Sequence, residues 1–212
     1  MGDSEESAFR QLFVVPHETI HRLNTYKDLL ITWNEKFNLV AKSTLPHIWL
    51  RHFTDSAQLM AYIPDTALTL ADMGAGAGFP GLVLAIMAQD LKKPLHVHSI
   101  EATNKKADFL QSVVDELHLP VTIHRKRIED IRDLKADVIT ARALKALPDL
   151  LVYANYLTHK DSICIFPKGQ NAAEELTQAR KYWTFAADTH TSRSDDTGSI
   201  LVLSSLRYKT RR

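Results

Sequence analysis

Glycine is scarce in this chain, and most of it is gathered in one short segment. Only seven of the 212 residues are glycine, which is about 3% against a usual value of about 7%. Four of the seven lie within residues 74–81. Because glycine reaches backbone conformations that other residues avoid, this clustering predicts an unusual backbone in that segment.

The context of the cluster points to a ligand. Asp72–Gly81 follows a short apolar stretch and precedes another, an order typical of strand, tight turn and helix. Glu101 closes the next expected strand, 101 − 78 = 23 residues beyond Gly78, about where nucleotide-binding folds place a carboxylate that accepts ribose hydroxyls. The alternative is a plain turn without a ligand.

Apolar periodicity predicts helices first and then an alternation of strands and helices. Spacings of three and four predict a helix from Pro16 to Val40 and another from Pro46 to near Pro64. The expected strands are 67–73, 95–100, 121–124, 137–141, 162–166 and 199–204, and the expected later helices are 82–87, 105–117, 147–157 and 172–182. Such alternation is typical of a mostly parallel sheet that binds ligands at the carboxyl ends of its strands.

Composition excludes several classes of protein. The formal charge of +1 means that any nucleic-acid contact must come from local patches. Cys164 is the single cysteine, so no disulfide and no cysteine-based zinc site can form within the chain, which fits a reducing cytosol. No apolar run approaches a membrane span, and the first ten residues do not resemble a signal peptide. We therefore expect a cytoplasmic protein without membrane contact.

Two ligand classes fit the glycine pattern. Residues 76–81 spell G-x-G-x-x-G, the dinucleotide fingerprint, whereas residues 74–78 spell G-x-G-x-G after an acidic residue, which resembles motif I of S-adenosylmethionine-dependent methyltransferases. The short chain, and Pro80 with no N–H to hold a pyrophosphate, favour the methyl donor. A small nicotinamide-dependent oxidoreductase and a nucleotide-binding regulatory module without catalysis are the alternatives.

Further motifs share one order and spacing. They are Trp33-Asn34-x-x-x-Asn38-Leu39, Arg51-His52-x-x-Asp55-Ser56, Asp72 through Gly81 with its Phe79-Pro80-Gly81 ending, Lys105, Arg142-Ala143 and Lys168-Gly169-Gln170. Together they resemble the ribosomal RNA small subunit methyltransferase G family, also called glucose-inhibited division protein B, over roughly residues 20–205. Two departures are Glu101, where aspartate is more usual, and the rigid Phe166-Pro167 pair before Lys168.

The resemblance implies a class I methyltransferase. Its fold is α/β: a Rossmann-like, mostly parallel seven-stranded sheet with helices on both faces and an N-terminal helical extension. We expect the extension at residues 1–64, the core at 65–206 and a basic tail at 207–212. The implied reaction methylates ring nitrogen seven of a guanine in 16S rRNA with S-adenosylmethionine, leaving S-adenosylhomocysteine. The expected partner is 16S rRNA within the small ribosomal subunit or an assembly intermediate, and the expected state is a monomer.

The resemblance also implies site residues. Those expected at the donor are Gly74, Gly76, Gly78, Phe79, Glu101 and Arg142, with Ile128 and Glu129 flanking the adenine. Those expected at the substrate are Arg51, His52, Asp55, Ser56 and Lys105. For Arg51 and Asp55, a local i,i+4 ion pair is the alternative. The basic run 124–127 and the basic C-terminus are further candidates for phosphate contacts.

The implied chemistry needs no general base. Ring nitrogen seven of guanine carries a free lone pair, so it can attack a methyl group without losing a proton. The catalytic candidates are Arg142 and Lys168, which we expect to orient substrate phosphate or the guanine edge. The alternative is that both residues pair within the rim of the sheet.

Three patterns resemble other enzymes. His17-Glu18-Thr19-Ile20-His21 matches the H-E-x-x-H zinc signature, but helix geometry places both histidines opposite the apolar stripe, so we expect no metal. Tyr156-x-x-x-Lys160 resembles a short-chain dehydrogenase pair whose glycine pattern this chain lacks. His96-x-His98 has no evident third ligand.

Overall fold

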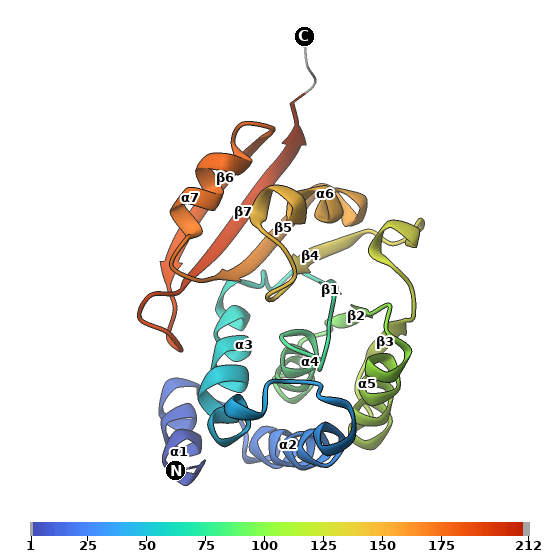
Figure 1. Ribbon diagram of the computed structural model, residues 1–212, viewed down its shortest axis with the longest axis vertical. Coiled ribbons are helices and arrows are strands. Elements are labelled where there is room, and N and C mark those ends of the chain that lie inside the picture. The colour runs from blue at the N-terminus through green and yellow to red at the C-terminus, as the bar shows by residue number, and fades with distance from the viewer. Residues whose placement is uncertain (1, 210–212) are drawn as a thin grey trace.

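A single seven-stranded sheet organises the chain. The computed structural model describes residues 2–209. The strand order is β3-β2-β1-β4-β5-β7-β6 (Figure 1), and β7 alone runs antiparallel to its neighbours β5 and β6. The strands are β1 (Thr69–Met73), β2 (His96–Ile100), β3 (Val121–His124), β4 (Ala136–Thr140), β5 (Thr158–Lys168), β6 (Trp183–Thr191) and β7 (Ser199–Tyr208).

Helices precede the sheet and connect its strands. The α-helices are α1 (Gly2–Leu12), α2 (His17–Phe37), α3 (Asp55–Ala57), α4 (Gly81–Asp90), α5 (Asn104–Leu117), α6 (Leu147–Leu157) and α7 (Ala172–Ala179). Three tight 3-10 turns, η1 (Lys42–His47), η3 (Gln58–Tyr62) and η4 (Ile128–Asp130), and one π-helical turn, η2 (Trp49–Thr54), complete the elements. No helix among the described residues is long and apolar enough to cross a lipid bilayer.

Each face of the sheet has its own hydrophobic core. Side chains alternate along β1, so that Leu70 packs into one core and Ala71 and Met73 into the other. The first core joins the sheet to α2, α4 and α5, and the second joins it to α6 and α7 (Figure 1). The N-terminal helices therefore share a core with the sheet.

The fold-class prediction is confirmed, with three local differences. β6 was not predicted, because apolar and polar residues alternate only over residues 183–187 before the strand becomes polar. α1 was not predicted either, because Phe9 is its one fully buried core residue. Residues 46–64 do not form one helix. The segment passes instead through 3-10, π and α turns, and Pro46, which has no N–H to donate, lies inside the first 3-10 turn. β7 continues through Tyr208, and residues 210–212 of the expected tail lie outside the described residues.

The strand order predicts a ligand site at the carboxyl ends of the central strands. β1 lies between β2 and β4, so the connections leaving β1 and β4 diverge to opposite faces. Open parallel sheets bind ligands at such a reversal, outside the carboxyl ends of the strands. The glycine cluster follows β1, Glu101 follows β2, and Arg142 follows β4, so all three meet at this edge.

Candidate active site

The loop after β1 requires glycine for two different reasons. Gly74, Gly76 and Gly78 have φ angles of +65°, +59° and +93°, a region that other residues rarely enter. At Gly78 there is also no room, because an added Cβ would lie 2.5 Å from the Tyr26 hydroxyl and 2.6 Å from a Leu82 methyl. At Gly76 an added Cβ would meet only the Gly74 carbonyl, at 3.8 Å.

Tyr26 supports this loop from below. Its ring is fully buried on α2 and stacks on Phe79 with centroids 5.4 Å apart. Its hydroxyl donates a hydrogen bond to the Ala77 carbonyl, and burial raises the Tyr26 pKa well above its usual value. The helical extension therefore contacts the glycine loop directly.

Glu101 anchors the other side of the loop. One carboxylate oxygen accepts a hydrogen bond from the Gly76 N–H at 3.0 Å, and the other accepts one from the Thr103 N–H at 2.7 Å. The side chain is mostly buried. Because a carboxylate offers about four lone-pair sites, two remain for hydroxyl donors of a ligand.

Asp72 lies beneath the loop at the end of β1. One carboxylate oxygen accepts the Gly81 N–H at 2.9 Å, and the other is buried without a partner among the described residues. Burial raises the Asp72 pKa to about 7, with a further contribution from the charge of Glu101, against the lowering effects of the Gly81 hydrogen bond and Arg142.

Two cavities open beside the loop and share a wall. The small cavity, of about 460 Å³, is lined by Glu101, Ile128 and Glu129, with Lys106, Lys126 and Arg127 at its edge. The large cavity, of about 730 Å³, lies between the η2–α3 segment, the end of β5 and the β6–β7 loop. Both volumes are in the range of ligand pockets. The shared wall consists of Gly74, Arg142, Ala143, Leu144 and Lys145.

The small cavity combines an apolar surface with hydrogen-bond acceptors. Ile128 supplies an apolar surface for a base, and Glu101 and Glu129 supply acceptors for hydroxyls or an exocyclic amine. Gly74 brings backbone to the cavity without a side chain. Five of the residues expected at the methyl donor therefore line one space: Gly74, Glu101, Ile128, Glu129 and Arg142. Phe79 lines the large cavity instead.

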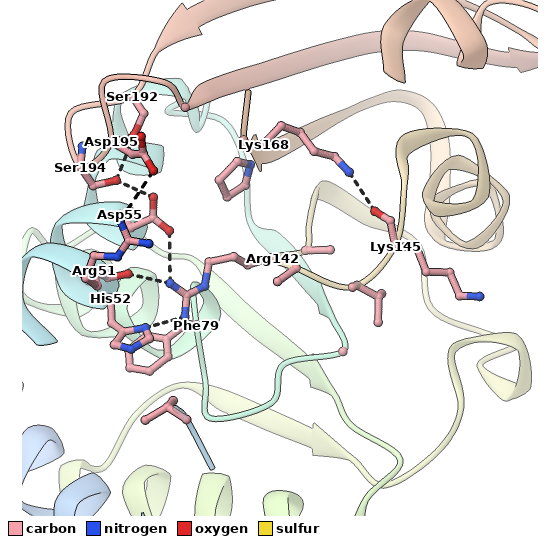
Figure 2. Close-up of a pocket in the computed structure, with 18 of the residues that line it drawn as sticks. Arg51, His52, Asp55, Phe79, Arg142, Lys145, Lys168, Ser192, Ser194 and Asp195 are labelled. Atoms are coloured by element: carbon pink, nitrogen blue, oxygen red, sulfur yellow. Dashed lines mark hydrogen bonds and ion pairs between the residues drawn. The ribbon is translucent and has the colours of Figure 1, made fainter. Parts of the chain in front are cut away.

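Arg142 is held rigidly where the cavities meet. Its Nη1 donates to the Arg51 carbonyl at 2.9 Å and to Asp55 Oδ2 at 3.2 Å, and its Nη2 donates to His52 Nδ1 at 2.8 Å. Figure 2 shows the guanidinium reaching across to these three residues, above the Phe79 ring at 4.9 Å. These bonds use three of its five N–H groups, so Nε–H and one Nη2–H have no partner among the described residues. Ala143 follows with a φ of +52°, an uncommon conformation for alanine that marks a constrained turn.

The partners of His52 fix its protonation state. A guanidinium only donates hydrogen bonds, so His52 Nδ1 must accept, and the proton of the neutral ring lies on Nε2, which is 2.9 Å from the Thr44 hydroxyl. Burial, and then the charges of Arg142 and Arg51, lower the His52 pKa to about 3. The ring stacks on Phe79 at 4.7 Å. His52 is therefore a neutral acceptor that orients Arg142.

Asp55 connects Arg142 to the β6–β7 loop. Its Oδ2 pairs with Arg142, and its Oδ1 accepts the Ser194 hydroxyl at 2.7 Å. Gln58 adds three hydrogen bonds to the same loop: its Nε2 donates to the Ser192 and Ser194 hydroxyls, and its Oε1 accepts from the Arg193 N–H. The alternative i,i+4 pair between Arg51 and Asp55 is absent from the described ion pairs.

Lys168 is also paired, on the far wall of the large cavity. Its Nζ donates to the Lys145 carbonyl at 2.8 Å (Figure 2). The same Nζ donates to Glu175 Oε2, also at 2.8 Å. Only 10% of the Lys168 side chain is exposed. The same Glu175 oxygen accepts the Leu147 N–H at the start of α6. Lys168 thus has the pairing within the sheet rim that the alternative interpretation describes, while it still lines the cavity.

The structure brings most of the expected site residues together. Those lining the cavities are Arg51, His52, Asp55, Gly74, Phe79, Glu101, Ile128, Glu129, Arg142 and Lys168. Gly76 and Gly78 shape the loop behind them, Ser56 is buried with its hydroxyl on the His52 carbonyl, and Lys105 lies over the Phe37 ring at 5.4 Å. These four do not line either cavity.

Sequence reasoning missed several lining residues. Lys106, rather than Lys105, lines the small cavity, and Leu144, Lys145 and Tyr153 join it from beyond β4. Ser192, Ser194 and Asp195 reach the large cavity from the β6–β7 loop, which carries no motif. The basic run gave a partial signal, since Lys126 and Arg127 lie at the small cavity.

His17 and His21, in contrast, are exposed on α2, as predicted. Over residues 2–209, no three His, Cys, Asp or Glu side chains are placed to hold a metal ion.

Comparison with known proteins gives consistent matches. A family model described as rRNA small subunit methyltransferase G matches residues 19–197. The protein named ribosomal RNA small subunit methyltransferase G from Rhodospirillum centenum is 46% identical over 198 residues, which cover 93% of this chain and 89% of that protein. The protein of the same name from Hyphomonas neptunium is 42% identical and covers 94% of each chain.

A solved structure supports the fold independently. The TehB-like SAM-dependent methyltransferase from Corynebacterium glutamicum superimposes with a TM-score of 0.53 at 13% sequence identity, covering 72% of this chain and 87% of that chain. At this identity the match speaks for the class I methyltransferase fold.

Proposed function

The chain belongs to the rRNA small subunit methyltransferase G family, and on that premise we propose that it methylates ring nitrogen seven of a guanine in 16S rRNA. The observation that carries this proposal is the meeting of the two cavities at Gly74 and Arg142. One cavity suits the nucleoside of a methyl donor, and the other leaves space for an acceptor base.

The donor side is assigned to the loop and the small cavity. When bound, S-adenosylmethionine supplies a methyl group on a positively charged sulfur, and its product is S-adenosylhomocysteine. Glu101 accepts ribose hydroxyls while it holds the loop through the Gly76 N–H. Ile128 and Glu129 flank the adenine, and Gly74 and Phe79 lie along the path between the cavities.

The acceptor side needs orientation rather than proton transfer. The lone pair of the guanine nitrogen must face the donor, and positioning of this kind can contribute about 7–11 kcal/mol to catalysis. Arg142 is suited to this because three hydrogen bonds fix its guanidinium, and its remaining N–H groups can hold an oxygen on the guanine edge. His52 and Asp55 therefore act as positioning residues for Arg142. Lys168 lines the same cavity, where its bond to Glu175 holds it in place.

The wider setting follows from the family. We assign residues 1–64 to the helical extension and 65–206 to the methyltransferase core. We place the protein in the cytoplasm as a monomer whose substrate is 16S rRNA in the small subunit or an assembly intermediate. Comparing methyl transfer to small subunits with transfer to naked 16S rRNA distinguishes these substrates.

The test separates donor binding from transfer. Calorimetry should give tight binding of S-adenosylhomocysteine and none of NAD. Arg142→Ala should lower methyl transfer to small subunits far more than it lowers S-adenosylhomocysteine binding. Arg132→Ala should change neither, because Arg132 is exposed in the connection before β4 and lines neither cavity. NAD binding without S-adenosylhomocysteine binding would contradict the proposal.

A further inference from the structure

Three of the four cationic side chains that line the large cavity form ion pairs, and these pairs differ in length and exposure. Arg142 and Lys168 have ion-pair distances of 3.2 Å and 2.8 Å and side chains 19% and 10% exposed. The pair of Arg51 with Asp195 is longer, at 3.6 Å, and its side chains are 52% and 41% exposed. Of these three pairs, only the Arg51–Asp195 pair can be exchanged for another anion at little cost, because exposed pairs contribute little free energy.

The backbone of Arg51 is held by Arg142, whereas its guanidinium has only one ion-pair partner among the described residues. Its carbonyl accepts the hydrogen bond from Arg142, and its guanidinium crosses the mouth of the large cavity to Asp195 (Figure 2). No other carboxylate pairs with this guanidinium among the described ion pairs. Arg51 can therefore change partners without disturbing Arg142.

Asp195 uses its two oxygens for different purposes. Oδ1 accepts the Thr197 N–H and hydroxyl at 2.9 Å and 2.8 Å, which closes the turn of the β6–β7 loop. Oδ2 faces Arg51. The Arg51–Asp195 contact is thus a separate function of a carboxylate that the loop already holds in place, and the Ser194 and Gln58 bonds keep that loop against α3 independently.

A phosphodiester is the anion that Arg51 would meet in an RNA substrate. Guanidinium–phosphate contacts are charge-assisted and commonly bidentate, so they are stronger than a single long contact to a carboxylate. From the proposed function, we infer that Asp195 is an internal competitor for substrate phosphate: it pairs with Arg51 at the mouth of the large cavity, and an RNA backbone phosphate takes its place when the acceptor base enters. Asp195 thereby lowers affinity for RNA that does not form this contact well.

The test is a double-mutant cycle on RNA affinity. The dissociation constant for a 16S rRNA transcript is measured with saturating S-adenosylhomocysteine for the wild type, Asp195→Asn, Arg51→Ala and the double variant. Asparagine keeps the Oδ1 acceptor for Thr197 and removes only the charge facing Arg51. Asp195→Asn should bind RNA up to about 5-fold more tightly, the range set by an exposed ion pair, and this gain should disappear in the Arg51→Ala background.

Asp196→Asn is the matched control. It removes the same charge one residue away, on an exposed side chain with no ion pair among the described residues. The inference would be overturned if Asp196→Asn increased RNA affinity as much as Asp195→Asn does. It would also be overturned if Asp195→Asn still increased RNA affinity in the Arg51→Ala background. If Asp195→Asn binds RNA no more tightly than the wild type and melts at a lower temperature, the Arg51–Asp195 pair only stabilises the structure. That result would also overturn the inference.

The salt dependence of RNA binding gives a second readout. Arg51→Ala should reduce its slope by about one phosphate contact, and Arg132→Ala should not. An unchanged slope for Arg51→Ala would contradict the phosphate assignment. Absence of methyl transfer by the wild type would count against the proposed function itself, so the two failures are distinguishable.

Discussion

Two glycines of the donor loop should respond very differently to one added methyl group. Gly76 and Gly78 both have positive φ, so alanine at either position costs about 1–2 kcal/mol in backbone strain. At Gly78 the new Cβ would also overlap Tyr26 and Leu82, and overpacking of a filled core typically adds about 1–3 kcal/mol. Gly78→Ala should therefore lower the free energy of unfolding by about 2–5 kcal/mol, and Gly76→Ala by about 1–2 kcal/mol.

Urea unfolding of the two variants beside the wild type measures these losses. The Gly76→Ala protein should remain folded, because its added Cβ meets almost no protein atoms. It should bind S-adenosylhomocysteine poorly, because the strained backbone displaces the Gly76 N–H that Glu101 holds. The Gly78→Ala protein should show its defect mainly as lost stability. Equal losses of stability in both variants would refute the steric reasoning, and wild-type S-adenosylhomocysteine affinity in Gly76→Ala would refute the loop's assigned role.

Three further predictions concern charged groups. Burial raises the Asp72 pKa from its ordinary value of 3.8 to about 7, so its contribution to stability is complete below pH 4 and is lost as the pH rises through 7; Asp72→Asn should flatten the fall in melting temperature over this range, and an unchanged slope would contradict the assignment. Glu101→Gln places an N–H₂ group where an N–H donor must be accepted, so S-adenosylhomocysteine affinity should fall at least about tenfold by calorimetry; retained affinity would exclude Glu101 from the donor site. Glu175→Gln leaves the mostly buried Lys168 ammonium without its counter-charge and should cost about 1–3 kcal/mol in urea unfolding, whereas no loss would show that the pair does not hold Lys168.

The parts of the fold that could be predicted are those with strong local signals. The strand at 121–124 and the helix at 147–157 have the predicted limits; Pro120 directly precedes the strand, and Pro148 lies in the first turn of the helix. β6 pairs only with β7 at the edge of the sheet, so much of its length is exposed and lacks a continuous apolar signature. Edge strands of this kind depend on tertiary pairing that local patterning does not encode.

The site shows the same division between local and long-range information. The glycine loop and Glu101 are recognisable because one short segment and one spacing define them. The partners of Arg142 lie about 90 residues earlier in the chain, and the π turn at Trp49–Thr54 changes which side chains of that segment face the cavity. No spacing rule could therefore assign Asp55 to Arg142 and Arg51 to Asp195, instead of to each other.

The most direct measurement is the identity of the methylated atom. Small ribosomal subunits are incubated with the protein and S-adenosylmethionine carrying a labelled methyl group, and the 16S rRNA is digested to nucleosides for mass spectrometry. We predict label in 7-methylguanosine alone, and none when the rRNA is transcribed with 7-deazaguanosine, which lacks the accepting nitrogen. Label in another nucleoside, or undiminished labelling of the 7-deaza rRNA, would contradict methylation at ring nitrogen seven.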